Sequence, residues 1–381
     1  MEEEMKEMIK RTAVVTLAGV MAAGMLTGCG SKTLDGTKTV ATIDGTDIPL
    51  GIVSLYARQQ QEQTTAMYLS FMGSADNIWD TSDDSGETYG EQAVDSSLKA
   101  VELMYLLKEK AADYNVEITD DEETAIADAA SQFMSDNSEE TIKELGVTED
   151  QVKTLLELRT IQQKTHDSIV AEGNITVSDD EANQSSFTYV SISTSGDDIT
   201  DDEKAEKKEQ AQEILDKMKE DPTADMSEVA KEVDDSYSAV QGNFTVKESD
   251  DEDSSAYPEE VLTVLRGLTE GEVASDIIET DTGYYVVRLD KVLDEDATAS
   301  KRESLKSSKE EDYYTETTDG WLDDADVKEV KKVLKTLKIT DSHTFTAPTA
   351  TPTPEVTEEP KATEAPAATE TPAPTATQAA K

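Results

Sequence analysis

Residues 267–292, GLTEGEVASDIIETDTGYYVVRLDKV, decide the fold of the central part of this chain. Gly271 and Glu272 form a turn signal that follows a run with apolar periodicity. Residues 276–280 and 284–292 are rich in Ile, Val and Tyr, and an Asp-Thr-Gly turn joins them. By its pattern alone, the stretch predicts a surface β-hairpin.

The residues upstream of this hairpin predict further strands and helices of one small domain. Thr200 and Glu203 have the spacing of a capping box, which marks the start of a helix. In chain order, the expected elements are a strand at residues 187–193, a helix at 200–220, a helix at 226–233, a loop at 234–239 and a helix at 257–265.

In this order the elements resemble a parvulin-type peptidyl-prolyl isomerase domain. The GEVAS turn that begins at Gly271 is similar to the GE(V/M)S turn of that family, and TDTGYY at 280–285 is similar to its (T/S)xxGYH strand. MSEVAKEV at 226–233 is similar to the family's F..LAKEYS helix. Tyr285 stands where the family motif has histidine. The resemblance implies a parvulin-like α/β domain over residues 185–295 that acts on prolyl peptide bonds.

The resemblance also implies where a site would lie. Parvulins hold the prolyl ring on an apolar floor, beside two histidines from adjacent strands and a Cys or Asp from a loop. The corresponding positions here are the candidate catalytic residues Tyr189, Ser236 and Tyr285, and the candidate substrate-binding residues Tyr257, Val261 and Asp235. A tyrosine hydroxyl donates and accepts hydrogen bonds, so a weakened isomerase is one interpretation. A domain that binds chains without catalysis is another, and the tyrosines also fit a plain aromatic core.

Residues 1–28 predict a lipoprotein signal peptide. A basic segment that ends at Arg11 precedes an apolar run of about fourteen residues, which is too short to span a bilayer comfortably. The run ends in Leu-Thr-Gly-Cys, which resembles the bacterial lipobox, so Cys29 is the expected site of lipidation. The mature chain would be anchored at the extracytoplasmic face of the cell membrane. Four early glutamates leave the translation start open between Met1 and Met8.

The segment that follows the signal peptide predicts the start of a mostly helical domain. TVATIDGTDIP at residues 39–49 alternates and turns at Asp44 and Gly45, which predicts a type I′ hairpin followed by a helix to about Ser70. This opening resembles the N-terminal segment of SurA- and PrsA-like foldases. NITVSDDE at 174–181 resembles the joint that precedes their isomerase domain.

Residues 72–171 predict a loop followed by several helices. Trp79 lies in the acidic loop at 72–90, either within a linker or as an exposed client contact. Apolar residues recur at helical spacing after the loop, and capping boxes at Thr119 and Thr148 begin two further helices.

Residues 298–339 predict a second helical segment, with Ser300 and Glu303 as its capping box. The foldase resemblance implies that this segment packs on the N-terminal helices, so that the isomerase-like domain is inserted between them. Residues 347–381 contain seven of the ten prolines and no aromatic residue, which predicts a disordered tail. A wall spacer, a glycosylated stalk and a passive tail all fit that composition.

The expected fold class is therefore α+β, with a SurA-N-like helical domain, an inserted parvulin-like domain and a disordered tail. The expected division is signal peptide 1–28, tether 29–38, SurA-N-like helical chaperone domain 39–184, parvulin-like domain 185–295, C-terminal helices 296–345 and Pro/Thr-rich tail 346–381.

Composition excludes several classes of function. The net charge of −50 argues against a nucleic-acid interface, because phosphate binding needs a basic surface. One cysteine excludes an intrachain disulfide, and two histidines, His166 and His343, argue against a zinc site. We expect no metal and no cofactor.

These expectations favour a membrane-anchored, extracytoplasmic foldase or chaperone whose partners are unfolded or secreted client proteins. The alternative is a solute-binding lipoprotein or a structural envelope lipoprotein. Against solute binding, the chain lacks the two-lobed alternation of strands and helices, and only 5% of its residues are aromatic.

Overall fold

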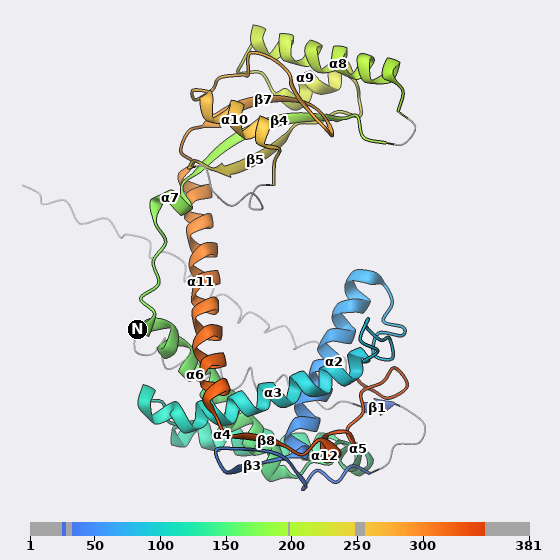
Figure 1. Ribbon diagram of the computed structural model, residues 1–381, viewed down its shortest axis with the longest axis vertical. Helices are drawn as coiled ribbons and strands as arrows, with labels where there is room; N and C mark the ends of the chain where they lie inside the picture. The colour runs from blue at the N-terminus through green and yellow to red at the C-terminus, as the bar shows by residue number, and fades with distance from the viewer. Residues whose placement is uncertain (1–24, 28–32, 197–198, 248–255, 347–381) are drawn as a thin grey trace, which may run out of the picture.

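The computed structural model describes residues 25–27, 33–196, 199–247 and 256–346. Two packed units lie at the ends of one long helix, α11 (Glu295–Asp324) (Figure 1). We name them the helical unit (residues 33–182 and 325–343) and the sheet unit (residues 184–291). The fold is mixed α+β and mostly helical, as the sequence predicts.

Two of the sequence-based predictions lie outside the described residues: lipidation at Cys29 and the disordered tail. In the part of the chain that the structure describes, no helix has both the length and the apolar character that a membrane span requires.

The helical unit is built on four long helices, which bury a stripe of side chains that includes Leu55, Leu98 and Leu155. Its elements before the sheet unit are β2 (Thr39–Ile43), β3 (Thr46–Pro49), α2 (Leu50–Met72), α3 (Tyr89–Lys110), η1 (Ala111–Tyr114), α4 (Asp120–Asp136), α5 (Glu139–Leu145), α6 (Glu149–Glu172) and α7 (Asp179–Ala182). The capping boxes predicted at Thr119 and Thr148 are confirmed, because each side chain accepts a hydrogen bond from the backbone N–H three residues on.

The N-terminal hairpin has the predicted turn and lies against the C-terminal part of the chain. Asp44 and Gly45 have φ values of 47° and 86°, as a type I′ turn requires. The Asp44 backbone N–H donates to the carbonyl of Asp326 at 3.2 Å, and the Asp326 N–H donates to Asp44 Oδ1 at 3.0 Å. The turn therefore holds the point where the chain returns from α11.

The prediction of one helical segment over residues 298–339 is wrong after Asp324. There the chain forms strand β8 (Val327–Glu329), which pairs antiparallel with β2 in a sheet of order β3-β2-β8, and then the short helix α12 (Lys331–Leu334). The apolar residues that suggested a helical stripe instead pack Leu334 and Leu337 onto the helical unit from an irregular segment. A further strand, β9 (Thr344–Thr346), pairs with β1 (Met25–Thr27).

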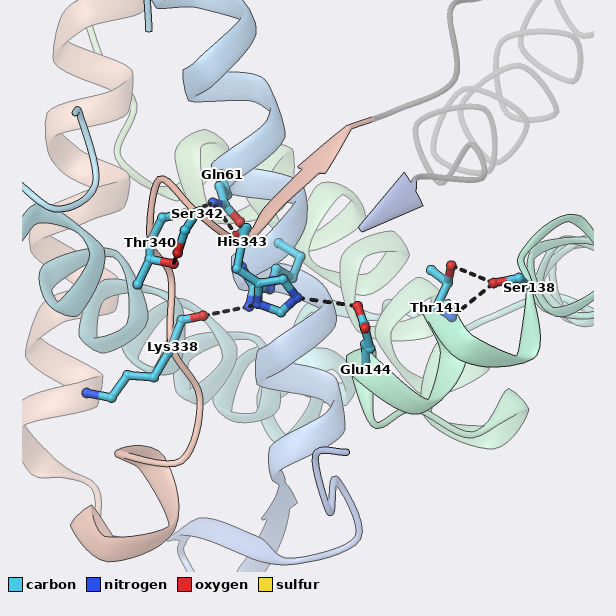
Figure 2. Close-up of polar contacts among 9 residues, drawn as sticks. Gln61, Ser138, Thr141, Glu144, Lys338, Thr340, Ser342 and His343 are labelled. Atoms are coloured by element: carbon cyan, nitrogen blue, oxygen red, sulfur yellow. Dashed lines mark hydrogen bonds and ion pairs between the residues drawn. The ribbon is translucent and has the colours of Figure 1, made fainter. Parts of the chain in front are cut away.

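A buried polar group holds the end of this returning segment (Figure 2). The Arg58 guanidinium, on α2, donates to the backbone carbonyls of Lys338 at 2.5 Å and His343 at 2.9 Å. His343 Nδ1 lies 2.9 Å from the same guanidinium, and its Nε2 lies 3.3 Å from Glu144 Oε2 on α5. Burial lowers the pKa of Arg58 to about 10, so the guanidinium stays charged at neutral pH.

Helix α11 begins earlier than predicted, because Asp294 rather than Ser300 caps it. The Asp294 carboxylate accepts a hydrogen bond from the Ala297 N–H at 3.1 Å. The Asp294 N–H donates to the carbonyl of Gln184 at 2.7 Å, so the two ends of the sheet unit meet. At the far end of α11, Tyr314 packs with Ile169 of α6.

The sheet unit is a four-stranded antiparallel sheet of order β5-β4-β7-β6 with helices on both faces (Figure 1). Its elements are β4 (Gln184–Ser193), α8 (Asp201–Glu220), α9 (Met226–Val233), β5 (Val240–Thr245), α10 (Glu259–Gly267), β6 (Ile278–Thr280) and β7 (Gly283–Lys291). The predicted terminal hairpin is confirmed as β6 and β7, which pair Ile278 with Tyr285.

Candidate functional site

The two faces of the sheet carry different clusters, because side chains alternate along each strand. Val190 on β4 and Val286 on β7 point toward α8 and α9, in an aliphatic cluster. Tyr189 on β4 and Tyr285 on β7 point to the opposite face, toward α10. The candidate site is this second face.

Five aromatic rings gather on the α10 face, and we call them the aromatic cluster: Phe187, Tyr189, Phe244, Tyr257 and Tyr285. Phe187 is fully buried at its centre, and its ring centroid lies 4.9 Å from that of Tyr257 and 5.3 Å from that of Tyr189. The centroid of Tyr189 lies 5.7 Å from that of Tyr257 and 5.9 Å from that of Tyr285. The structure thus brings together the three tyrosines predicted from the sequence.

Gly242 on β5 makes room for this packing. A Cβ atom at this position would lie 2.3 Å from the Tyr257 hydroxyl oxygen and 2.8 Å from the Phe187 ring. Any side chain here would displace both rings. Glycine is therefore required for Tyr257 to reach the sheet from the segment before α10.

The tyrosine hydroxyls lie close enough to influence one another. Burial raises the pKa of Tyr189, and the neighbouring Tyr257 and Tyr285 hydroxyls raise it further. Tyr189 is therefore a neutral phenol at physiological pH, able to donate one hydrogen bond and accept others. The three tyrosines are half-buried, so the face offers aromatic surface and hydroxyl groups together. The sequence has neither His nor Cys between residues 184 and 291.

The other predicted site residues lie apart from the rings or beneath them. Val261 on α10 is fully buried in the core under the aromatic cluster, so it supports the rings from below. Ser236 and Asp235 are exposed on the loop before β5. The Ser236 hydroxyl donates to Asp234 Oδ1 at 2.6 Å, and the next residue, Tyr237, packs on the α8 face instead.

A second surface, which the sequence analysis did not anticipate, lies at the C-terminal end of α2. We call it the α2 tip, and its large exposed apolar residues are Met67, Tyr68, Leu69, Phe71 and Met72. Phe71 is 83% exposed and Met72 74% exposed, and Gly73 ends the helix in a left-handed conformation. The signal was present in the sequence MYLSFM, which is apolar on all sides of a helix rather than along one stripe.

The prediction that Trp79 is an exposed client contact is wrong. Its side chain is 5% exposed, and its indole N–H donates to Thr65 Oγ1 on α2 at 3.2 Å. Trp79 instead forms one wall of a groove of about 790 Å³ between α2 and α3, which continues to the α2 tip at Tyr68 and Met72. Asp341 holds this wall, because its carboxylate accepts hydrogen bonds from the N–H groups of Trp79 and Asp80.

Among the described residues, no group of three or more His, Cys, Asp or Glu side chains is placed to hold a metal ion. The chemistry that the aromatic cluster offers is therefore non-covalent: aromatic surface for an apolar ring, and hydroxyl groups for the polar atoms beside it.

Comparison with known proteins identifies the sheet unit. The family model for the rotamase, a PPIC-type peptidyl-prolyl isomerase domain, matches residues 191–291. No curated protein matches the chain significantly.

Solved structures with a similar fold come from three bacteria. The PrsA peptidylprolyl isomerase of Bacillus cereus is 20% identical, with 68% of this chain and 96% of that chain covered and a TM-score of 0.31. The PrsA of Bacillus anthracis is 18% identical, with 60% and 96% covered and a TM-score of 0.26. A SurA-like chaperone of Campylobacter jejuni is 9% identical, with 77% and 99% covered and a TM-score of 0.26. We base the assignment that follows on the family model.

Proposed function

Residues 191–291 are a peptidyl-prolyl isomerase domain of the PPIC type, and we propose that the whole chain is an extracytoplasmic foldase that assists the folding of secreted proteins. The observation that carries the proposal is the aromatic cluster, which the strands and α10 of this rotamase domain build at one face of the sheet. Its clients are unfolded chains that contain prolyl bonds.

Prolyl isomerisation requires no nucleophile. The barrier to rotation is about 18–20 kcal/mol, because twisting the peptide bond removes its resonance. A catalyst therefore binds the prolyl ring on an apolar surface and stabilises the twisted bond with hydrogen bonds that are placed in advance.

The aromatic cluster offers both elements of this mechanism. The rings of Tyr189, Tyr257 and Tyr285 form the surface for a prolyl ring, and their hydroxyls supply hydrogen bonds where the family has imidazoles. Ser236 and Asp235 remain candidates on the loop before β5. A phenol hydrogen-bonds more weakly than a charged imidazolium, so we expect slow catalysis with retained binding of prolyl segments.

The proposed location rests on the sequence of the N-terminal segment. An apolar run that ends in Leu-Thr-Gly-Cys supports cleavage before Cys29 and lipidation of its thiol. Each buried methylene contributes about 0.8 kcal/mol, so two or more acyl chains would hold the protein firmly at the membrane. The foldase would then act on chains as they emerge from the cytoplasmic membrane.

Refolding of a protein limited by a slow prolyl step tests the proposal. The chain that begins at Gly30 is added in catalytic amounts, and we expect the slow phase to accelerate. In stoichiometric amounts, it should suppress the aggregation of an unrelated unfolded protein. Absence of both effects would overturn the foldase proposal, whereas suppression without acceleration would leave a chaperone and remove the isomerase activity.

A pair of adjacent tyrosines provides the matched control. Tyr285→Phe removes a hydroxyl from the aromatic cluster and should reduce the acceleration while leaving the fold intact. Tyr284→Phe removes the hydroxyl of the neighbouring residue, which points to the α8 face, and should leave the acceleration unchanged. Equal rates for the two variants would exclude Tyr285 from the mechanism.

A further inference from the structure

We propose that the α2 tip and the groove beside it bind an extended segment of an unfolded polypeptide in which aromatic or aliphatic residues are flanked by lysine or arginine. The inference rests on the proposed foldase function, and it names a second binding site, separate from the aromatic cluster, and the chemistry of its ligand. Its grounds are the exposure of the tip, the lining of the groove and the distribution of charge around both.

The α2 tip exposes more apolar surface than its own fold uses. Met67 and Leu69 are 50% and 51% exposed, beside the more exposed Phe71 and Met72. A helix that is apolar all round is normally buried on all sides, and contiguous exposed apolar patches mark interaction sites. In Figure 1 the tip projects beyond the other helices of the helical unit, toward the rotamase domain.

The groove next to the tip has the dimensions and lining of a peptide site. Its volume of about 790 Å³ lies within the range of small-ligand pockets. Tyr56, Tyr68 and Trp79 supply aromatic surface. Neutral amides and hydroxyls alternate with these rings, as at Gln60, Thr64 and Gln92. Such groups hydrogen-bond the backbone of an extended chain without selecting its sequence.

The charge around the site selects basic ligands. Residues 59–98, which contain the tip, the loop and the first half of α3, include no lysine and no arginine. They include eight carboxylates: Glu62, Asp76, Asp80, Asp83, Asp84, Glu87, Glu91 and Asp95. Lysines approach only at the neighbouring hollow, where Lys338 lies 3.5 Å from Glu91. Apolar side chains with cationic neighbours therefore complement this surface.

The same charge argues against other occupants. A second copy of the chain would place the same carboxylates opposite one another, in a protein whose net charge is −50. A bilayer rich in anionic lipid would repel the tip, because membrane-binding surfaces are basic. An unfolded segment with basic flanks satisfies both the apolar tip and its acidic border.

Fluorescence anisotropy with labelled peptides tests the proposal on the chain that begins at Gly30. One short peptide has Leu and Phe at its centre and lysines at both ends, and its partner has glutamates at the ends. We expect the lysine peptide to bind at least about tenfold more tightly, with an affinity that falls as salt is added. Equal affinity for the two peptides would overturn the proposal.

Two double variants locate the site. Phe71→Ser with Met72→Ser should weaken binding of the lysine peptide about tenfold, whereas Val292→Ser with Leu293→Ser, an adjacent exposed apolar pair near α11, should not. All four positions are at least 47% exposed, so circular dichroism should show intact folds. Unchanged binding by the α2 variant would overturn the site.

The refolding and aggregation assays separate this inference from the proposed function. A chain that fails in those assays but binds the lysine peptide through Phe71 and Met72 supports the binding site and overturns the foldase. A chain that succeeds in them while the α2 variant binds as well as wild type keeps the foldase and overturns the binding site.

Discussion

The two units of this chain place their polar and apolar side chains in opposite ways. In the rotamase domain Phe187 is fully buried among other rings. In the helical unit a guanidinium and a carboxylate, Arg58 and Glu102, are only 3% and 2% exposed, whereas Phe71 is 83% exposed. Burying charge costs free energy, and exposing apolar surface forgoes it. The rotamase domain is thus organised for its own stability, and the helical unit retains features that serve contacts with other chains.

The largest expected effect comes from the centre of the aromatic cluster. Phe187→Ala should lower the free energy of unfolding of the rotamase domain by about 3–5 kcal/mol, because it leaves a cavity among rings that it contacts directly. Urea denaturation followed by tyrosine fluorescence measures the change. Trp321 and Trp79 lie in or against the helical unit, so tryptophan fluorescence reports on that unit separately. A loss shared equally by both units would contradict the contrast.

Glu102 provides the next effect, from the interior of the helical unit. Burial raises the pKa of Glu102 from 4.5 to about 7, and the carboxylate of Glu329 raises it further. One of its oxygens is buried without a hydrogen-bond partner. The contribution of the protonated carboxyl to stability is therefore complete below pH 4.5 and is lost as pH rises through 7.

Glu102→Gln tests this ionisation, because the amide keeps the shape and removes the titration. We expect the variant to be more stable than wild type by up to about 3 kcal/mol at pH 8, with the difference vanishing near pH 4. Thermal unfolding across this pH range measures it. Glu91→Gln, at a half-exposed position on the same helix, should show no such pH-dependent gain.

A smaller effect is expected where His343 meets Arg58 and Glu144. Burial and the Arg58 charge lower the pKa of His343, opposed by Glu144. The folded state therefore favours the neutral ring, and its contribution to stability is present above the ordinary pKa of 6.5 and lost as pH falls below it.

Amide hydrogen exchange should show this loss as faster exchange in the segment around residues 338–343 at pH 5 than at pH 7, after correction for intrinsic rates. His343→Gln should abolish the pH-dependent part. His166→Gln, at the other histidine, which lies 36% exposed against Tyr314, should leave it unchanged. A segment whose protection does not vary with pH would remove His343 as its pH-sensitive group.

The smallest effect on stability is expected at the α2 tip. Phe71→Ala should change the free energy of unfolding by no more than about 0.5 kcal/mol, because the side chain is already mostly in solvent. The same substitution as in Phe187→Ala thus has a large structural effect in one unit and almost none in the other. A large destabilisation at Phe71 would show that the tip belongs to the core.

Local features of this fold could be predicted from the sequence, because they depend on neighbouring residues. The Asp44-Gly45 turn, the capping boxes at Thr119 and Thr148, and the final hairpin all follow from short-range chemistry. The family model confirms the parvulin-type domain that the motif around Gly271 suggested.

Features that depend on distant partners could not be predicted in the same way. Val327–Glu329 is a strand only because β2 pairs with it, and its apolar residues fit a helix equally well in isolation. The burial of Trp79 depends on Asp341 and Thr65. In the site, the sequence indicated the three tyrosines by motif position, whereas the central role of Phe187 required the packing itself.

The return of the C-terminal segment also determines when this protein can fold during export. Arg58 holds a carbonyl that lies 285 residues further along the chain, so the helical unit cannot close until nearly the whole polypeptide has been translocated. The rotamase domain draws its strands from one contiguous stretch and needs no such delay. A chain truncated after Asp324 should therefore retain a protease-resistant rotamase domain while its helical unit is digested. Until translocation ends, the foldase is itself an unfolded chain at the membrane.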